Sequence, residues 1–212
     1  MKKIGIFCLF GGLLFNINLT GASPEPYASL TLLPYKEHGW FCPPNQLALE
    51  KIINSRRPMV VVEVGCWLGL STCFMAERMP RGAKLYAVDH WDGSVEHHDA
   101  EFVGFLPTLY QQFLSNVVHR GLTDVIVPVR MSSKDAFVNL SVKADLVYID
   151  ASHDAESVYN DIIMWVQKLA PGGELYGDDY SWRTVREGLY RAANELGVQV
   201  EVFGGQAWKL VF

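Results

Sequence analysis

The sequence of 212 residues has few cysteines, few charged residues and no cluster of basic residues, and each shortage excludes a class of protein. Four cysteines are too few for a disulfide-stapled scaffold of this length. The net charge is −5, so nucleic-acid binding through phosphate neutralisation is not expected. Charged residues make up 19% and hydrophobic residues 50%, which is not the composition of a disordered chain. What is present suits one globular domain with its own core.

The first 23 residues differ from the rest of the chain. Lys2 and Lys3 precede the apolar run Ile4 to Phe15, and small residues follow around Ala22. This order is typical of a secretory signal peptide, and the run is too short for a stable membrane span. We therefore expect a signal peptide over 1–23, an N-terminal extension over 24–45 and a domain over 46–212. The expected localisation is export to the periplasm or medium, and the alternative is a cytoplasmic protein with an apolar extension.

Strand and helix patterns alternate along the remaining chain. Continuous β-branched runs such as 59–64 and 145–150 indicate strands buried on both faces. The predicted strands are 59–64, 84–89, 125–130, 145–150, 174–178, 198–203 and 207–212, and the predicted helices are 44–57, 70–79, 110–120, 133–139, 155–169 and 184–196. Gly204-Gly205 marks a final hairpin. The alternation predicts an α/β fold, namely a Rossmann-like, doubly wound, seven-stranded, mostly parallel sheet with an antiparallel C-terminal hairpin strand.

Glycines and acidic residues follow the predicted strands, at the sheet edge where such folds bind ligands. After the first strand, Gly65 and Gly69 allow a tight turn to approach a ligand, and the next helix offers its amide groups. Asp89 ends the second strand, where an acid commonly accepts the hydroxyls of a ribose. Asp150 and the pair Asp178-Asp179 end two later strands. Such residues also occur in ordinary turns. Their presence at the ends of four strands of one sheet favours a ligand site.

These residues carry a resemblance to a known superfamily, over roughly residues 45–212. The loop Glu63-Val64-Gly65-Cys66-Trp67-Leu68-Gly69-Leu70-Ser71, the strand-two Asp89 and the terminal hairpin resemble class I S-adenosylmethionine-dependent methyltransferases. Further motifs resemble bacterial metal-dependent O-methyltransferases that act on sugars. They are Val88-Asp89-His90-Trp91-Asp92-Gly93-Ser94, Tyr148-Ile149-Asp150-Ala151-Ser152-His153, Leu169-Ala170-Pro171-Gly172-Gly173 and Gly177-Asp178-Asp179-Tyr180.

The resemblance implies roles for individual residues. The residues implied to bind S-adenosylmethionine are Glu63, Gly65, Cys66, Gly69, Ser71, Asp89, Met131 and Ser132. Asp150, Asp178 and Asp179 would bind a divalent cation, and three carboxylates suit Mg²⁺ or another hard cation better than Zn²⁺. The implied acceptor is a small molecule or a glycan, and a homodimer is left open.

Methyl transfer to oxygen requires an aligned acceptor and a base for its proton. A cation beside the acceptor hydroxyl would lower the pKa of that hydroxyl. Asp150 and His153 are the predicted catalytic residues, with His153 as the base. The sugar O-methyltransferases typically have a second Asp where this chain has Ser152, so Asp154 is an alternative base. Capping a helix or lying in the shell of the metal is an alternative role for His153.

Aromatic residues outside these motifs indicate an acceptor pocket or lid. A long polar and aromatic stretch lies between the second strand and the next helix, and loops of this length are usually functional. That stretch contains Trp91, His97, His98, Asp99, Phe102, Phe105 and Tyr110. Trp40, Phe41 and Trp182 from other parts of the chain would complete the pocket. His97-His98 is a weak metal pair, because adjacent residues in an extended segment point apart.

Two other functions remain open at this stage. A nucleotide-dependent oxidoreductase could use a similar sheet, although the G-x-x-x-G spacing of the first turn differs from the G-x-G-x-x-G of dinucleotide-binding folds. A non-catalytic binding protein on the methyltransferase fold is the second alternative, because an exported enzyme would lack an obvious supply of a cofactor made in the cytoplasm.

Overall fold

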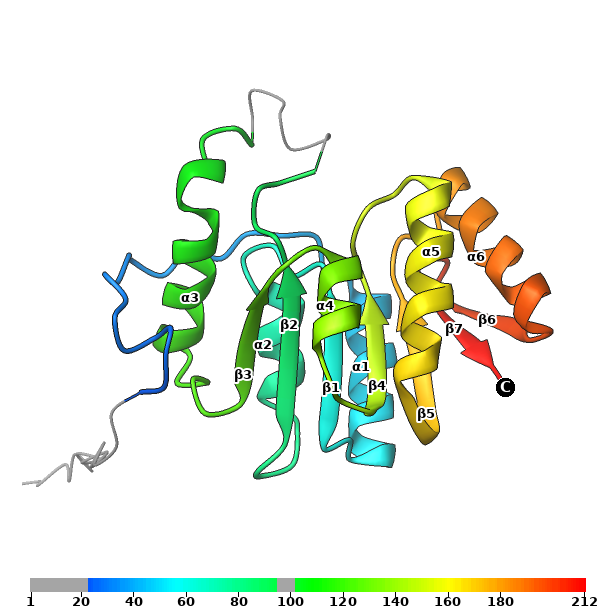
Figure 1. Ribbon diagram of the computed structural model, residues 1–212, viewed down its shortest axis with the longest axis horizontal. Helices are drawn as coiled ribbons and strands as arrows, with labels where there is room; N and C mark the ends of the chain where they lie inside the picture. Colours follow the sequence, from blue (N-terminus) through cyan, green and yellow to red (C-terminus); the bar gives the residue numbers. More distant parts are fainter. Residues whose placement is uncertain (1–22, 95–101) are drawn as a thin grey trace, which may run out of the picture.

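The structure, a computed structural model, describes residues 23–94 and 102–212 (Figure 1). Seven strands form one sheet in the order β3-β2-β1-β4-β5-β7-β6. The strands are β1 Val60–Val64, β2 Lys84–Asp89, β3 Ile126–Arg130, β4 Ala144–Ile149, β5 Leu169–Gly177, β6 Gln199–Phe203 and β7 Ala207–Val211. β1 to β5 are parallel neighbours, and β7 pairs antiparallel with both β5 and β6. The predicted doubly wound sheet with an antiparallel hairpin strand is confirmed.

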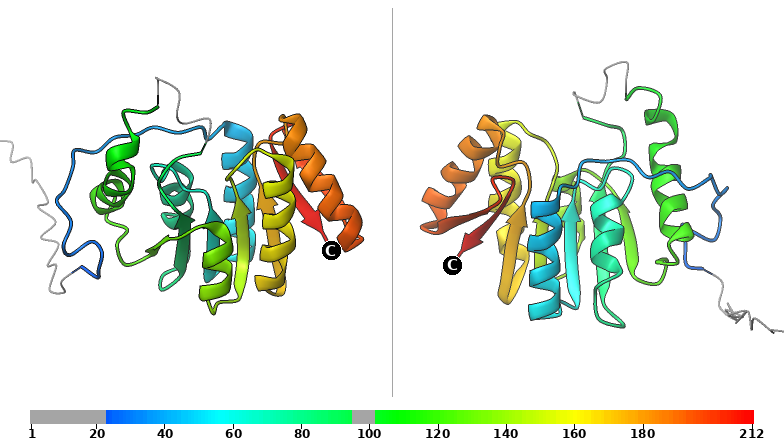
Figure 2. Two further views of the ribbon diagram at one scale, coloured as in Figure 1. Left: turned by 45° about the horizontal axis from the view of Figure 1, so that its top comes forward. Right: turned by 180° about the vertical axis from the view of Figure 1, so that it is seen from behind.

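Helices cover both faces of this sheet, and each face has its own apolar core (Figures 1 and 2). The helices are α1 Pro43–Arg56, α2 Leu70–Ala76, α3 Leu109–His119, α4 Ser133–Asn139, α5 Ala155–Trp165 and α6 Arg183–Leu196, with 3-10 turns η2 Leu106–Thr108 and η3 Val166–Lys168. Residues of α1, α2 and α3 pack on one face, and residues of α4, α5 and α6 pack on the other. The interior strands are therefore apolar on both sides, as their β-branched composition predicts.

The structure differs from the prediction where α5 meets β5. The helix was expected to continue to Leu169, with a strand beginning at Glu174. Instead α5 ends at Trp165, and β5 already begins at Leu169, which pairs with Ala144. Pro171-Gly172-Gly173 lies inside β5, where the register with β4 shifts between Ala144 and Leu146. Glycine and proline in a strand are typical of such a bulge, so here they mark an irregular strand and not only a helix stop.

The N-terminal extension is held against α3 by side chains of that helix. Asn116 accepts a hydrogen bond from the backbone nitrogen of Lys36 and donates one to its carbonyl oxygen. The Asn116 amide also donates to the carbonyl of Leu68 in the first glycine turn, over 2.8 Å. These bonds bring the segment from His38 to Phe41 to the C-terminal edge of the sheet.

Some predictions concern residues that the structure does not describe. The predicted signal peptide lies almost wholly in 1–22, and His97, His98 and Asp99 lie in 95–101. Within 23–94 and 102–212, no helix is long and apolar enough to cross a membrane.

Candidate active site at the carboxyl ends of the strands

The turn after β1 needs a glycine at its first position. Gly65 has a φ of +87°, and a Cβ atom there would lie 1.9 Å from the carbonyl oxygen of Asp150. The contact is close because β1 and β4 are neighbours, and Asp150 donates its backbone N–H to the carbonyl of Val64. The turn therefore passes directly over the end of β4. Trp67, two residues further on, has a φ of +46°, an uncommon conformation that concentrates at functional sites.

Asp89 at the end of β2 holds this turn in place. Its Oδ2 accepts hydrogen bonds from the backbone nitrogens of Cys66 at 2.9 Å and Trp67 at 3.1 Å. Its Oδ1 accepts one from the backbone nitrogen of Trp91 at 2.7 Å. A carboxylate has about four acceptor sites, so Asp89 orders the loop and keeps capacity for a ligand hydroxyl. The sequence identified the acid but not its bonds to the turn.

Glu63 lies beneath the turn and is completely buried. Ser71 donates a hydrogen bond to its Oε1, whereas Oε2 has no partner among the described residues. Burial raises the pKa of the Glu63 carboxyl to about 7, against the hydrogen bond from Ser71 that lowers it. Glu63 therefore supports the loop from below.

The raised pKa of Glu63 predicts a pH-dependent stability. Between the ordinary value of 4.5 and about 7 the folded protein holds a proton that the unfolded chain releases. The free energy of unfolding should therefore fall as pH rises through this window, by about 1.4 kcal/mol per pH unit. Glu63→Gln removes this titration, so from pH 5 to pH 8 its stability relative to wild type should improve by about 3 kcal/mol. Urea unfolding of both proteins without cofactor measures this, and parallel pH profiles would contradict it.

A cavity of about 540 Å³ runs along this edge of the sheet. Gly65, Cys66, Asp89 and Ser132 line it, as predicted for a cofactor site. The other predicted cofactor residues support its walls or lie nearby. Gly69 begins α2 at a φ of +85°, and Met131 is partly exposed and donates its backbone nitrogen to the carbonyl of Asp89. A volume of this size is typical of a small-molecule site.

A second cavity of about 420 Å³ shares a wall with the first. The shared residues are Gly65, Cys66, Trp67, Ser94, Asp150 and Ala151. Its other walls are largely aromatic and include Trp40, Phe41, Phe102 and Trp182, as predicted for an acceptor pocket. Trp91 is instead a core residue, 1% exposed, and it packs against Phe113 and Tyr110.

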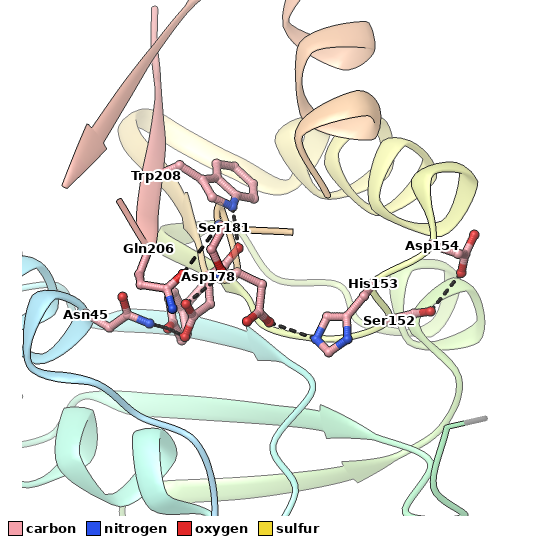
Figure 3. A network of polar contacts seen from close by, with 10 residues as sticks. Asn45, Ser152, His153, Asp154, Asp178, Ser181, Gln206 and Trp208 are labelled. Atoms are coloured by element: carbon pink, nitrogen blue, oxygen red, sulfur yellow. Dashed lines mark hydrogen bonds and ion pairs between the residues drawn. The ribbon is translucent and has the colours of Figure 1, made fainter. Parts of the chain in front are cut away.

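Three carboxylates, those of Asp150, Asp178 and Asp179, follow the ends of β4 and β5, and Figure 3 shows Asp178 among its neighbours. Burial, followed by the charges of Asp178, Asp179 and Glu63, raises the pKa of Asp150 well above its ordinary range. Burial and the charge of Asp179 also raise the pKa of Asp178. Acids that repel one another in a buried site take up protons more readily than acids in water.

The predicted metal ligands do not form a coordination group in this structure. Asp178 accepts the hydroxyl of Tyr148 on one oxygen and the backbone nitrogen of Asp179 on the other. Oδ2 of Asp179 is bonded to the ring of His153. Within the part of the chain that the structure describes, no three His, Cys, Asp or Glu side chains are arranged to hold a metal ion. The arrangement therefore does not fit a metal centre, and no reaction step below depends on one.

His153 instead pairs with Asp179. Its Nε2 lies 2.8 Å from Oδ2 of Asp179 (Figure 3). Its ring also stacks on Trp182, with centroids 4.6 Å apart. A carboxylate only accepts, so in the neutral ring this pair places the proton on Nε2, and Nδ1 is buried. Asp154, the alternative base, accepts the backbone N–H of Ser157 as the cap of α5, and this bonding lowers its pKa. The structure therefore assigns the cap to Asp154 and the pair with Asp179 to His153.

The sequence analysis assigned no role to two further residues that line or support the site. His38 accepts the indole N–H of Trp67 through Nδ1 at 3.0 Å, and both rings line the second cavity. Tyr148 is buried in β4 and reaches both Asp178 and Asn45 of α1. The aromatic composition around His38 was the available signal, but its distance in sequence from the turn hid the contact.

The fold and the two adjoining cavities define a class of protein, and comparisons with known proteins agree. The model of the methyltransferase domain family matches residues 62–180, which is more than half of the chain. The chain belongs to this family. Its fold is that of the class I methyltransferases. No protein with a curated description matches the chain in sequence.

Solved structures show the same fold at low sequence identity. The O-methyltransferase TomG of Streptomyces achromogenes, from tomaymycin synthesis and in complex with S-adenosylmethionine, aligns with a TM-score of 0.62 and 14% identity, over 80% of each chain. An O-methyltransferase of Bacillus cereus in complex with S-adenosylhomocysteine aligns with 0.60 and 15%, over 88% of this chain and 87% of that one. A precorrin 8w decarboxylase of Methanobacterium thermoautotrophicum aligns with 0.56 and 15%, over 85% and 95%. The fold thus supports more than one reaction, and the acceptor atom must be argued from the site.

Proposed function

We propose that this protein transfers the methyl group of S-adenosylmethionine to a hydroxyl oxygen of a small molecule or glycan. The observation that carries the proposal is the wall shared by the two cavities, with the His153–Asp179 pair on the side of the second. The first cavity would hold the cofactor, and the second would hold the acceptor. Because the two cavities adjoin at these shared residues, a methyl donor in the first and an acceptor in the second can be held in line for displacement.

The chain's own residues would prepare the acceptor. When bound, the cofactor supplies an electrophilic methyl group on sulfur and leaves as a thioether. His153 would act as the base for the acceptor hydroxyl, while Asp179 holds its ring and stabilises the charged form. The aromatic walls would exclude water and bind the flat face of a phenol or sugar. No Lys or Arg among the described residues lines this cavity, which favours a neutral acceptor over an anionic one.

Binding of the cofactor can be tested without knowing the acceptor. S-adenosylhomocysteine should raise the melting temperature of the wild-type protein, because it binds only the folded state. Asp89→Ala should remove most of this shift, since it removes two bonds to the turn, one to Trp91 and an acceptor at the cavity wall. Asp92→Ala, which removes an exposed carboxylate nearby, is the matched control and should keep the shift. A wild-type protein that does not respond would refute the cofactor assignment.

Divalent-metal assistance is tested by chelation. Since the three carboxylates are not arranged around a common ion, we expect turnover to persist in enzyme dialysed against a chelator. Methyl transfer from radiolabelled S-adenosylmethionine to a panel of phenols, sugars and amines measures this turnover. Loss of activity that Mg²⁺ restores would support a metal ion bound at the three carboxylates. Transfer only to amines would refute O-methylation. No transfer to any acceptor by a protein that binds the cofactor would favour the non-catalytic alternative.

A further inference from the structure

A polar face of α3 holds the backbone of the N-terminal extension. Gln112, Ser115 and Asn116 are neighbours on this face at helical spacing, and all three are buried. Gln112 donates a hydrogen bond to the carbonyl of Pro34 at 2.8 Å, and the Ser115 hydroxyl accepts the backbone N–H of Leu33 at 3.0 Å. Buried polar side chains normally have partners, and here the extension supplies them.

Asn116 binds the extension and the turn after β1 at the same time. Its Nδ2 donates to the carbonyl of Lys36 in the extension and to the carbonyl of Leu68 in the turn, each at 2.8 Å. Its Oδ1 accepts the backbone N–H of Lys36 and the side-chain N–H of Gln112, each at 3.1 Å. An asparagine amide has two donor hydrogens and two acceptor sites, so its bonding capacity is fully used. The side chain is 3% exposed, so water does not readily replace a lost bond.

A second bond joins the extension to the same turn. The indole N–H of Trp67 donates to Nδ1 of His38 at 3.0 Å, one residue from Leu68 and two from Lys36. Trp67 lines both cavities, whereas His38 lines the second. None of the described residues 23–42 lines the first cavity. A ligand in the first cavity would therefore contact the turn but not the extension.

We propose that Asn116 is a positioning residue that couples the two cavities, because it ties the wall of the second cavity over His38–Phe41 to the turn that lines the first. The inference rests on the proposed function, in which the first cavity holds the cofactor and the second the acceptor. A ligand that holds the turn would slow the local opening of the extension. Coupling is reciprocal, so a bound acceptor would in turn strengthen cofactor binding.

Residue-resolved hydrogen exchange by NMR, with and without saturating S-adenosylhomocysteine, tests the coupling. In the wild-type protein the ligand should slow exchange of the Leu33 and Lys36 amides about fivefold or more, although it touches neither. In Asn116→Ala the Leu33 amide keeps its bond to Ser115, but the effect of the ligand on its exchange should fall to about twofold or less. Calorimetry establishes that each protein is saturated with the ligand.

Ser115→Ala is the matched control, because it removes a bond to the extension on the same helix face and none to the turn. The Lys36 amide keeps its bond to Asn116 in this variant, so the ligand should still slow its exchange about fivefold. If Asn116→Ala is not folded, Asn116→Asp takes its place, since a carboxylate still accepts the N–H of Lys36 but does not donate to Leu68.

The reciprocal effect supplies a second measurement. An acceptor from the panel should lower the dissociation constant of S-adenosylhomocysteine about fivefold or more in the wild-type protein and about twofold or less in the Asn116 variant. An equal decrease in both proteins would contradict the role of Asn116.

The outcomes separate this inference from the proposed function. If the wild-type protein does not bind S-adenosylhomocysteine, the cofactor assignment fails, and the coupling fails with it. If the ligand binds but leaves exchange of both amides unchanged, only the coupling is overturned. If Ser115→Ala loses the effect on Lys36 as fully as the Asn116 variant loses it on Leu33, the effect reflects docking of the extension as a whole, and the role of Asn116 is overturned.

Discussion

Gly65→Ala is expected to lower the free energy of unfolding by about 3 kcal/mol or more and to abolish binding of S-adenosylhomocysteine. Two costs add in this variant. The φ of +87° is unfavourable for alanine, and the new Cβ would lie 1.9 Å from the carbonyl oxygen and 2.6 Å from the carbonyl carbon of Asp150. Both contacts are to backbone, which cannot rotate away, so β1 and β4 would have to separate at their ends. The cofactor cavity is built on that junction.

Gly82→Ala separates the two costs. Gly82 has a φ of +85°, and a Cβ atom there would meet nothing within 4 Å. This variant should lose only about 1–2 kcal/mol, which is the usual cost of the left-handed conformation for an alanine. It should still bind S-adenosylhomocysteine, because Gly82 lies at the opposite edge of the sheet, before β2. Urea unfolding and calorimetry measure both quantities. Equal losses in the two variants would contradict the close approach of the turn to β4.

His153→Gln is expected to lower kcat by about a hundred- to ten-thousandfold while the dissociation constant of S-adenosylhomocysteine stays unchanged. Glutamine can donate a hydrogen bond to Asp179 but cannot take a proton from the acceptor hydroxyl. The loss should therefore fall on the chemical step, because His153 lines the acceptor cavity and not the cofactor cavity. Single-turnover measurements with a reactive acceptor from the panel give the rate.

The pairing of His153 with Asp179 supplies a sharper test. Asp179→Asn should also lower kcat, and the double variant should be little slower than His153→Gln alone, since residues that act as a unit are non-additive. His90→Gln is the matched control: it makes the same change at the end of β2, beside the cofactor cavity only, and should leave kcat within a few-fold of wild type. Multiplied losses in the double variant would show that the two residues act independently.

The fold could be predicted from the sequence because its signals are local. Buried strands such as β1 and β4 are short and mostly apolar, with β-branched residues in both, and the helices show apolar residues at helical spacing. The error at β5 also has a local cause. Pro171-Gly172-Gly173 is a common sequence at a helix end, and only pairing with β4 shows that the strand has already begun at Leu169. Pairing across a sheet is not encoded in a short window.

The sequence predicted where the site residues lie better than it predicted their hydrogen bonds. Parallel strands end at one edge, so acids and glycines at strand ends must gather there in any doubly wound sheet. Asp89, Asp150, Asp178 and Asp179 do gather there. Which atoms these carboxylates bond to depends on shifts in position of about an ångström or less. These positions follow from packing between segments far apart in the chain. For this reason the bonds of Asp89 to the turn, and of Asp179 to His153, were not foreseen.

The sequence by itself determined the class of fold, the edge at which ligands bind and the methyltransferase family. The tertiary structure decided how the acids are used. It placed two predicted metal ligands, Asp178 and Asp179, in hydrogen bonds to Tyr148, to His153 and between one carboxylate and the other's backbone nitrogen, and Asp161 of α5 lines the first cavity. It also brought His38 of the N-terminal extension onto Trp67. The physical reason is the same in each case. Secondary structure and strand-end chemistry follow from neighbouring residues, whereas a hydrogen bond between distant residues exists only after the helices have packed on the sheet.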